Sequence, residues 1–228
     1  MNSNKQELKD LANNLTQNQI SMVMLFEFDM VLNHSEAIDA VEGDIVECGV
    51  WRGGFSIFLA HLFPDRAIWV CDSYEGFQPL EEARFEYYKE ERHVPSYVMA
   101  ASLEEVQENF KTYGLDGQDR IKYLKGFVKD TLPTAPIEKI ALLRLDVDGY
   151  SPTMEILEEL YDKVQPGGYI IFDDLCLYES KDAVYDFLQN RNLPLEVIDP
   201  ITEQRIDLNI PYVQTNSGFV AGSYIIKK

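Results

Sequence analysis

Residues 43–77 contain side chains whose types and spacing suit a nucleoside-binding site. Glu47, Gly49 and Gly53 give the pattern E-x-G-x-x-x-G after one apolar run, and Asp72 follows the next apolar run. Glycines let a bulky ligand approach the backbone, and a carboxylate at a strand end can accept hydrogen bonds from ribose hydroxyls. The pattern predicts a pocket for a cofactor that carries a nucleoside, although the same glycines could form an ordinary tight turn.

The spacing of the glycines also bears on the identity of the cofactor. A dinucleotide site has the pattern G-x-G-x-x-G and holds a pyrophosphate at a helix N-terminus. Here that spacing is absent, the bulky Trp51 lies in the turn, and Glu47 would repel a pyrophosphate. S-adenosylmethionine has no phosphate and carries two cationic centres, so an acidic pocket suits it. We therefore expect S-adenosylmethionine, with Glu47 near its ammonium group, and a nicotinamide dehydrogenase is the weaker alternative.

A second group of acidic residues follows two later apolar runs, with Asp146 after the first and Asp173 and Asp174 after the second. In an open parallel sheet the ligand lies beyond the carboxyl ends of the strands. Three carboxylates at that edge repel one another unless a divalent ion or protons lie among them, and oxygen-only ligands favour Mg²⁺. The alternative is that the aspartate pair caps a helix or turn. Asp148 could be a further ligand, a substrate contact or a proton acceptor.

The elements that must position these residues alternate between strand-like and helical patterns from residue 44 onward. This alternation predicts an α/β fold with a mostly parallel sheet, and the consecutive strand-like runs at the end predict an antiparallel edge. Without an internal repeat or a linker, residues 1–228 are expected to form a single domain. The expected strands are 45–48, 67–71, 121–124, 141–145, 169–172, 195–198, 212–214 and 218–226, and the expected helices are 5–33, 55–63, 103–113, 128–132, 153–164 and 181–191.

Two segments lie outside this alternation. Residues 1–40 are expected to form a helical cap over the domain or over a neighbouring subunit, and their apolar second half favours a homo-oligomer. Residues 78–100 are charged and aromatic and contain two prolines. A segment of this kind between regular elements often covers a site. Four aromatic residues in it could wall an acceptor pocket or form a subunit contact: Phe85, Tyr87, Tyr88 and Tyr97.

The composition limits the class of protein. The chain has 228 residues, of which 46% are hydrophobic and 12% aromatic, and this is enough for one packed domain. The formal net charge of −19 argues against a nucleic-acid partner, because binding phosphates needs clustered Lys and Arg. No apolar run approaches the roughly 18 residues that span a bilayer, and no signal-peptide pattern is present. We therefore expect a cytoplasmic protein without nucleic-acid or membrane partners.

Several blocks of the sequence together resemble one known family, the macrocin O-methyltransferases. The blocks are VEGDIVECGVWRGGFSIFLA, DSYEGF, KGFVKDTLP, LRLDVDGYSPTMEILEELY and PGGYIIFDDL, within residues 40–190. This family includes enzymes that methylate sugar hydroxyls of macrolide and aminocoumarin antibiotics. The resemblance implies the Rossmann-like class I S-adenosylmethionine-dependent methyltransferase fold, with a mostly parallel seven-stranded sheet, an antiparallel edge and an N-terminal helical cap. It also implies S-adenosylmethionine and Mg²⁺ as cofactors.

The resemblance assigns roles to individual residues. Asp72 would hold the ribose, with Ser73 beside it. Gly126 and Phe127 would lie by the adenine. The methionine end of the cofactor would be lined by Glu47, Gly49, Trp51, Gly53, Gly54 and Ser56, and the metal would be bound by Asp146, Asp173 and Asp174.

The expected activity is methyl transfer to a hydroxyl group. Chelation of two adjacent hydroxyls by Mg²⁺ would orient the acceptor and lower the pKa of the attacking hydroxyl. Asp148 or Asp146 would then accept its proton. We predict an O-methyltransferase whose acceptor is a small-molecule glycoside or sugar, either a glycosylated natural product or a glycan precursor. The alternatives are a catechol-like O-methyltransferase of the same fold and a non-catalytic cofactor-binding scaffold subunit.

Overall fold

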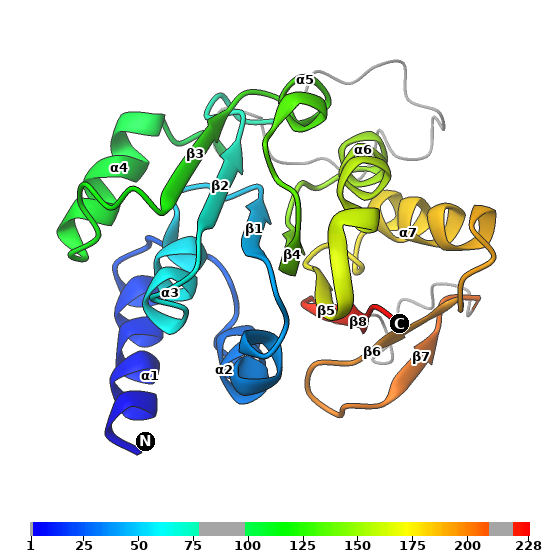
Figure 1. The fold of residues 1–228 in the computed structure, drawn as a ribbon, viewed down its shortest axis with the longest axis horizontal. Helices are drawn as coiled ribbons and strands as arrows, with labels where there is room; N and C mark the ends of the chain where they lie inside the picture. The colour runs from blue at the N-terminus through cyan, green and yellow to red at the C-terminus, as the bar shows by residue number, and fades with distance from the viewer. Residues whose placement is uncertain (1, 78–98, 210–220) are drawn as a thin grey trace.

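The computed structural model describes residues 2–77, 99–209 and 221–228, and in these segments eight strands form one sheet with helices on both faces (Figure 1). Residues 78–98 of the expected cover at 78–100, the expected strand at 212–214 and the first residues of the expected strand at 218–226 lie outside the described residues. The strands are β1 (Asp44–Cys48), β2 (Ile68–Asp72), β3 (Ile121–Lys125), β4 (Ile140–Leu145), β5 (Val164–Phe172), β6 (Glu196–Ile198), β7 (Arg205–Asp207) and β8 (Ser223–Ile226). The helices are α1 (Asn2–Gln17), α2 (Leu25–Asp39), α3 (Gly54–Leu62), α4 (Leu103–Thr112), α5 (Val128–Thr131), α6 (Tyr150–Leu160) and α7 (Tyr178–Asn190).

The sheet has the strand order β3-β2-β1-β4-β5-β8-β6-β7. The first five strands in this order are parallel, and β8, β6 and β7 are joined to them by antiparallel pairing. The expected mostly parallel sheet with an antiparallel edge is therefore confirmed. The described sheet has eight strands where the family resemblance implied seven. All but β7 overlap the expected strand ranges, and β7 was not expected because its three residues are too few and too polar to give a strand pattern. The strand order reverses between β1 and β4, where open α/β sheets bind ligands.

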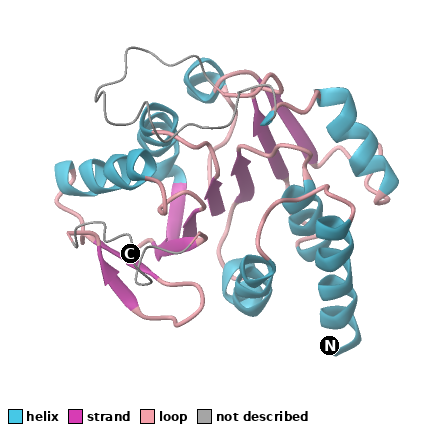
Figure 2. Ribbon diagram, turned by 180° about the vertical axis from the view of Figure 1, so that it is seen from behind, coloured by secondary structure: helices cyan, strands magenta, loops and turns pink. Residues whose placement is uncertain are grey.

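Both faces of the parallel strands are buried, which explains their nearly continuous apolar sequences. Successive residues of β1 point to opposite faces: Ile45 packs with α1 to α4, and Val46 packs with α5 to α7. The view from behind in Figure 2 shows the helices on either side of the strands. Because side chains alternate along a strand, Glu47 must point to the same face as Ile45, toward α2 and α3.

The expected N-terminal helix at 5–33 is two helices. The helical conformation is interrupted at residues 18–24, where Gln19 has a positive φ of 57°, and α2 begins only at Leu25. The 18–24 loop lies against the start of α3, since the backbone N–H of Gly54 donates to the carbonyl of Ile20 at 3.2 Å. Hydrophobic periodicity continues across the break, so the sequence pattern could not reveal it.

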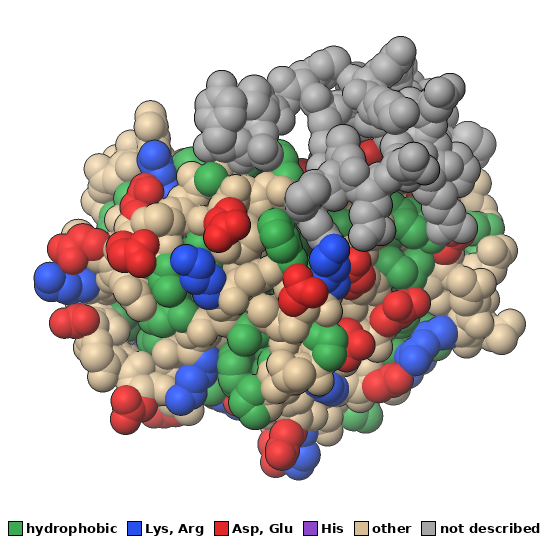
Figure 3. Space-filling view, turned by 90° about the horizontal axis from the view of Figure 1, so that it is seen from above, with side chains coloured by type: hydrophobic (Ala, Val, Ile, Leu, Met, Phe, Trp, Pro, Cys, Tyr) green, Lys and Arg blue, Asp and Glu red, His purple; other side chains and the backbone are tan. Residues whose placement is uncertain are grey.

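Charged side chains of both signs lie on one face of the described residues. Acidic side chains lie among basic ones on the face shown in Figure 3. Exposed ion pairs join Lys139 to Glu42 and Arg191 to Asp162, each at 2.7 Å. Among the helices of the described segments, none combines the length and apolar character needed to cross a bilayer.

Candidate functional site

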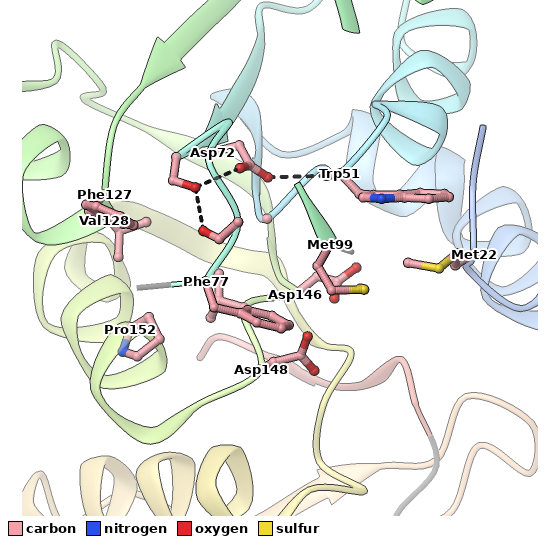
Figure 4. A pocket seen from close by; sticks show the side chains of 14 residues that line it. Met22, Trp51, Asp72, Phe77, Met99, Phe127, Val128, Asp146, Asp148 and Pro152 are labelled. Atoms are coloured by element: carbon pink, nitrogen blue, oxygen red, sulfur yellow. Dashed lines mark hydrogen bonds between the residues drawn. The ribbon is translucent and has the colours of Figure 1, made fainter. Parts of the chain in front are cut away.

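A cleft of about 670 Å³ opens where β1, β2 and β4 end. In Figure 4 Trp51 and Met22 lie on one side of the cleft, and Phe127 and Val128 lie on the other. The position is the one that the strand order predicts for a ligand.

Asp72 ends β2 and is fixed by the turn that follows β1. Its Oδ2 accepts hydrogen bonds from the backbone N–H groups of Val50 at 2.7 Å and Trp51 at 3.2 Å (Figure 4). Its Oδ1 accepts from the backbone N–H of Tyr74 at 2.8 Å. Burial raises the pKa of Asp72, and these backbone hydrogen bonds oppose the rise. The result is a carboxylate with a defined orientation at the cleft.

The glycines near Asp72 serve different purposes. Gly49 lines the cleft and has a φ of +84°, and a Cβ there would lie 1.6 Å from the carbonyl oxygen of Asp146. A Cβ on Gly53 would instead meet α4 at 2.9 Å, and a Cβ on Gly54 would meet the 18–24 loop at 2.5 Å. Gly49 therefore lets the chain pass close to the end of β4, whereas the other two allow α3 to pack.

Three carboxylates meet at the ends of β4 and β5. Asp146, Asp173 and Asp174 each offer an oxygen, and these oxygens lie within 4.8 Å of one another. Asp174 accepts hydrogen bonds through Oδ2 from the backbone N–H groups of Val147 and Asp148, both at 3.0 Å. Asp174 thus caps the turn at residues 147 and 148, as the capping alternative expected, and the aspartate pair also converges with Asp146 from the neighbouring strand.

The electrostatics of this cluster fit a hard divalent cation. Burial raises the pKa of Asp146 well above its ordinary value, and the charge of Asp173 raises it further. Burial also raises the pKa of Asp174, with Asp148 and Asp146 adding to the rise. Closely spaced carboxylates that resist ionisation are stabilised by a cation among them, and an oxygen-only set suits Mg²⁺.

Arg144 is a site residue that the sequence reasoning missed. It lies in β4 with 0% exposure, and its Nη1 donates to Glu47 Oε1 and Asp146 Oδ2, both at 2.8 Å. Its Nη2 donates to Asp173. The available signal was a single charge inside the apolar run ALLRL, two positions before Asp146 and hence on the same face.

Glu47 is buried between β1 and α3, with 1% exposure. It lies opposite Arg144 in the β1–β4 register, and its second oxygen accepts from the Ser56 hydroxyl. Burial raises the pKa of Glu47, and Arg144 and Ser56 oppose the rise. Both oxygens of Glu47 are therefore engaged by the protein.

A second cavity of about 630 Å³ adjoins the cleft. The two share Met22, Trp51, Met99, Asp146 and Asp148 in their walls. The second cavity is also lined by the 18–24 loop and by acids from three different elements. The cleft and the cavity therefore meet at the acidic cluster.

Glu27 in α2 is another acid that the sequence reasoning missed. It is 1% exposed, it lines the second cavity, and its Oε2 lies 3.7 Å from Arg144 Nη2. Burial raises the pKa of Glu27 to about 9, and the charge of Asp173 adds to the rise. Its signal was a charge within the apolar start of α2, which resembles any half-exposed helix position.

The predicted site residues fall into three groups. Gly126 donates its backbone N–H to the carbonyl of Asp72 at 2.9 Å and so supports the cleft from outside. The first group lines the cleft: Gly49, Trp51, Asp72, Ser73, Phe127, Asp146 and Asp148. The second group lines only the second cavity: Glu47, Asp173 and Asp174. The third group lines neither of these two spaces: Gly53, Gly54, Ser56 and Gly126.

The chain is similar in sequence to O-methyltransferases. The family model of the macrocin-O-methyltransferases (TylF) matches residues 8–205. The mycinamicin III 3''-O-methyltransferase of Micromonospora griseorubida is 38% identical, over 71% of this chain and 66% of the relative. The 8-demethyl-8-(2,3-dimethoxy-alpha-L-rhamnosyl)-tetracenomycin-C 4'-O-methyltransferase of Streptomyces olivaceus is 42% identical, over 72% of this chain and 64% of the relative. The alignments thus span slightly under two thirds of the length of these two relatives.

One solved structure is similar in both sequence and fold. The structure of the O-methyltransferase NovP matches with a TM-score of 0.76 and 32% sequence identity. The match covers 91% of this chain and 81% of that chain. The similarity therefore extends over most of the chain.

Proposed function

Because the chain belongs to the macrocin-O-methyltransferase family, we propose that it transfers the methyl group of S-adenosylmethionine to a sugar hydroxyl with the help of Mg²⁺. Its architecture is the class I methyltransferase fold. The observation that carries the proposal is that the cleft beside Asp72 and the acid-lined cavity meet at Asp146 and Asp148. This arrangement suits a cofactor and an acceptor that bind side by side.

The cleft would hold the cofactor, which supplies an electrophilic methyl group when bound. Asp72 is oriented to accept the ribose hydroxyls, with Ser73 next to it and Phe127 in the wall toward the adenine. Gly49 lets this wall of the cleft pass close to the end of β4, where a side chain would collide with the Asp146 carbonyl. Glu47 lines the second cavity and not the cleft, so the methionine end of the cofactor would extend from the cleft toward it. Both oxygens of Glu47 are engaged, and its contribution would be its negative charge near the cofactor's ammonium group.

The acidic cluster would hold the metal. Asp146, Asp173 and Asp174 would bind Mg²⁺, which orients adjacent hydroxyls and lowers the pKa of the attacking one when bound. The support for this assignment is the convergence of three carboxylates from two strands and their raised pKa values.

Asp148 is the better candidate for the proton acceptor. Asp146 already accepts a hydrogen bond from Arg144 and belongs to the metal set. Asp148 lines both the cleft and the second cavity, and its backbone has a φ of +49°, a conformation that L-residues rarely adopt. Strained backbone of this kind clusters at active sites. Asp148 would take the proton of the acceptor hydroxyl as the methyl group is transferred.

The second cavity would receive the acceptor. Its walls combine acids with apolar side chains, among them Met22, Val23, Met24 and Phe55. The first relative is named for 3''-O-methylation of mycinamicin III, and the second for 4'-O-methylation of a tetracenomycin that bears a dimethoxyrhamnosyl group. We therefore assign a glycosylated natural product or a glycan precursor as the acceptor, in preference to a catechol.

Calorimetric titration with S-adenosylhomocysteine, repeated with Mg²⁺ and with EDTA, tests the cofactor site. Binding should survive EDTA, and methylation of a panel of glycosides should need Mg²⁺. The absence of S-adenosylhomocysteine binding would refute the proposal, and methylation that resists EDTA would refute its metal part. Transfer to catechols alone, or binding without transfer, would favour the two alternatives. The homo-oligomeric state stays a prediction, which sedimentation analysis would test.

A further inference from the structure

We propose that Arg144 is a positioning residue that couples the cofactor side of the site to the metal side through a single guanidinium group. The inference rests on the proposed function, because it concerns the residues assigned there to the cofactor and to Mg²⁺. Arg144 itself lines neither the cleft nor the second cavity. Its effect would therefore pass through the acids that it holds.

The hydrogen bonds of Arg144 reach both sides at once. Its Nη1 donates to Glu47 Oε1 and to Asp146 Oδ2, each at 2.8 Å, and its Nη2 donates to Asp173. Glu47 belongs to β1, Arg144 and Asp146 to β4 and its end, and Asp173 to the end of β5. One side chain thus joins three neighbouring strands of the sheet at the point where the ligands would bind.

The burial of Arg144 constrains the positions of its ion-pair partners. Arg144 has 0% exposure, and Glu27, Glu47, Asp146 and Asp173 each have Arg144 as an ion-pair partner in the described part of the chain. Four carboxyl groups meet this one guanidinium; those of Glu27 and Glu47 are buried with it, whereas those of Asp146 and Asp173 are partly exposed at the edge of the site. Because a buried unpaired charge is strongly disfavoured, the guanidinium of Arg144 must keep these acids within its reach.

The shape of the guanidinium matters as much as its charge. An arginine presents several N–H donors in a planar fork, whereas a lysine has one nitrogen on a flexible stem. The Phe55 ring lies 4.5 Å from the guanidinium carbon and fixes the plane of the fork. A lysine at position 144 would keep the positive charge but could not bridge Glu47, Asp146 and Asp173 with the same geometry.

The network also selects which oxygens are held. Arg144 binds Oδ2 of Asp146 and Oδ1 of Asp173, while backbone N–H groups bind Oδ2 of Asp174. Each acid of the metal set is thus fixed through one oxygen before any cation arrives. Groups that orient metal ligands in this way typically change metal affinity by about 10- to 100-fold when they are removed.

The test compares Arg144→Lys with wild type and with Arg191→Lys. Arg191 forms a bidentate ion pair with Asp162 at the surface, at 2.7 and 2.8 Å, and so controls for the loss of an arginine fork. Affinity for Mn²⁺ alone and for S-adenosylhomocysteine alone is measured by calorimetry, and folding is followed by circular dichroism. We expect Arg144→Lys to weaken Mn²⁺ binding about 10-fold or more and also to weaken S-adenosylhomocysteine binding, with Arg191→Lys unchanged.

A folded Arg144→Lys variant that binds both ligands as wild type does would overturn the inference, even if its melting temperature fell. A melting shift without a change in affinity would mean that Arg144 is only structural. Failure of wild type itself to bind Mn²⁺ would overturn the proposed metal site, and this inference with it. The two failures are therefore distinguishable.

A second pair of variants keeps the test decisive if Arg144→Lys does not fold. Glu47→Gln removes the charge of a cofactor-side acid that touches Arg144, and Asp72→Asn does the same for one held by backbone N–H groups instead. With Glu47 neutral, the positive charge of the Arg144 guanidinium interacts more strongly with Asp146 and Asp173. We expect Glu47→Gln to weaken Mn²⁺ binding more than Asp72→Asn does, and equal Mn²⁺ affinities of the two variants would overturn the coupling.

Discussion

Replacing Gly49 by alanine should destabilise the protein for two reasons, the positive φ of this position and the close approach of the end of β1 to the end of β4. A Cβ at Gly49 would lie 1.6 Å from the carbonyl oxygen of Asp146 and 3.2 Å from a methyl carbon of Val147. Gly114, after α4, also has a positive φ of 77°, but a Cβ there would meet nothing within 4 Å. Gly114→Ala is therefore a matched control that carries the conformational cost without the collision.

The two costs differ enough to measure. An alanine in the left-handed region costs about 1–2 kcal/mol at either position. At Gly49 the collision must also displace strand ends whose hydrogen bonds, from Gly49 to Cys71 at 2.8 Å and from Asp146 to Cys48 at 2.9 Å, are worth roughly 1 kcal/mol each. Overpacking adds about 1–3 kcal/mol. We expect Gly49→Ala to lower the free energy of unfolding by about 4 kcal/mol or more, against about 1 kcal/mol for Gly114→Ala.

Urea unfolding and thermal melting give the comparison directly. For a chain of this size, 1 kcal/mol corresponds to about 2–4 °C, so Gly49→Ala should lose about 8–16 °C and Gly114→Ala about 2–4 °C. Gly49→Ala should also weaken S-adenosylhomocysteine binding, because the displaced turn carries the N–H groups that orient Asp72. Equal stability losses in the two variants would refute the close approach as the reason for glycine at position 49.

Three further predictions concern acids of the site. Asp174→Asn should abolish methylation but leave the calorimetric affinity for S-adenosylhomocysteine largely unchanged, because Asp174 is held by backbone N–H groups and not by Arg144, and a parallel loss of that affinity would contradict the two-site arrangement. Asp72→Ala should raise the Kd for S-adenosylhomocysteine by about 10- to 100-fold even in EDTA, because it removes a charged acceptor worth roughly 1.5–3 kcal/mol; an unchanged Kd would exclude Asp72 from cofactor binding. The pKa of Glu27 is about 9 in the folded state, against an ordinary value of 4.5, so the folded state binds more protons than the unfolded state between these two pH values. The stabilising contribution of protonated Glu27 is therefore complete below pH 4.5 and is lost as the pH rises toward 9. The unfolding free energy of the metal-free protein should therefore fall between about pH 6 and pH 8.5, by at most about 1.4 kcal/mol per pH unit from this group, and an equal decline in Glu27→Gln urea titrations would rule out Glu27 as the cause.

The parallel sheet and its acidic rim could be predicted because they follow from local pattern. Apolar runs followed by an acid gave Asp72, Asp146 and Asp173, and parallel strands bring their carboxyl ends to one edge whatever the rest of the chain does. The turn after β1 was also predictable from its glycines. The reason for glycine at position 53 could not be predicted from the sequence. The assignment of Gly53 to the cofactor overlooked the packing of α4, which leaves no space for a side chain there.

The charged network could not be predicted in the same way. Whether a lone charge in an apolar run is buried depends on partners from other elements, and Arg144 finds them on α2, β1 and the end of β5. Glu27 is even less visible, since one acid in a helix usually faces solvent. The break at residues 18–24 was missed because apolar positions continue through it. These features depend on contacts between distant parts of the chain, and local periodicity carries no information about them.

The place of β8 in the sheet imposes an order on biosynthesis. β6 and β7 precede β8 along the chain, yet β8 lies between β5 and β6, so the hairpin of β6 and β7 cannot join the sheet until β8 has left the ribosome. Until then the edge of β5, the strand that leads into Asp173 and Asp174, remains unpaired. Unpaired strand edges favour aggregation in incomplete chains. A nascent chain that stalled before residue 223 would therefore expose the unpaired, aggregation-prone edge of β5 next to the acidic cluster.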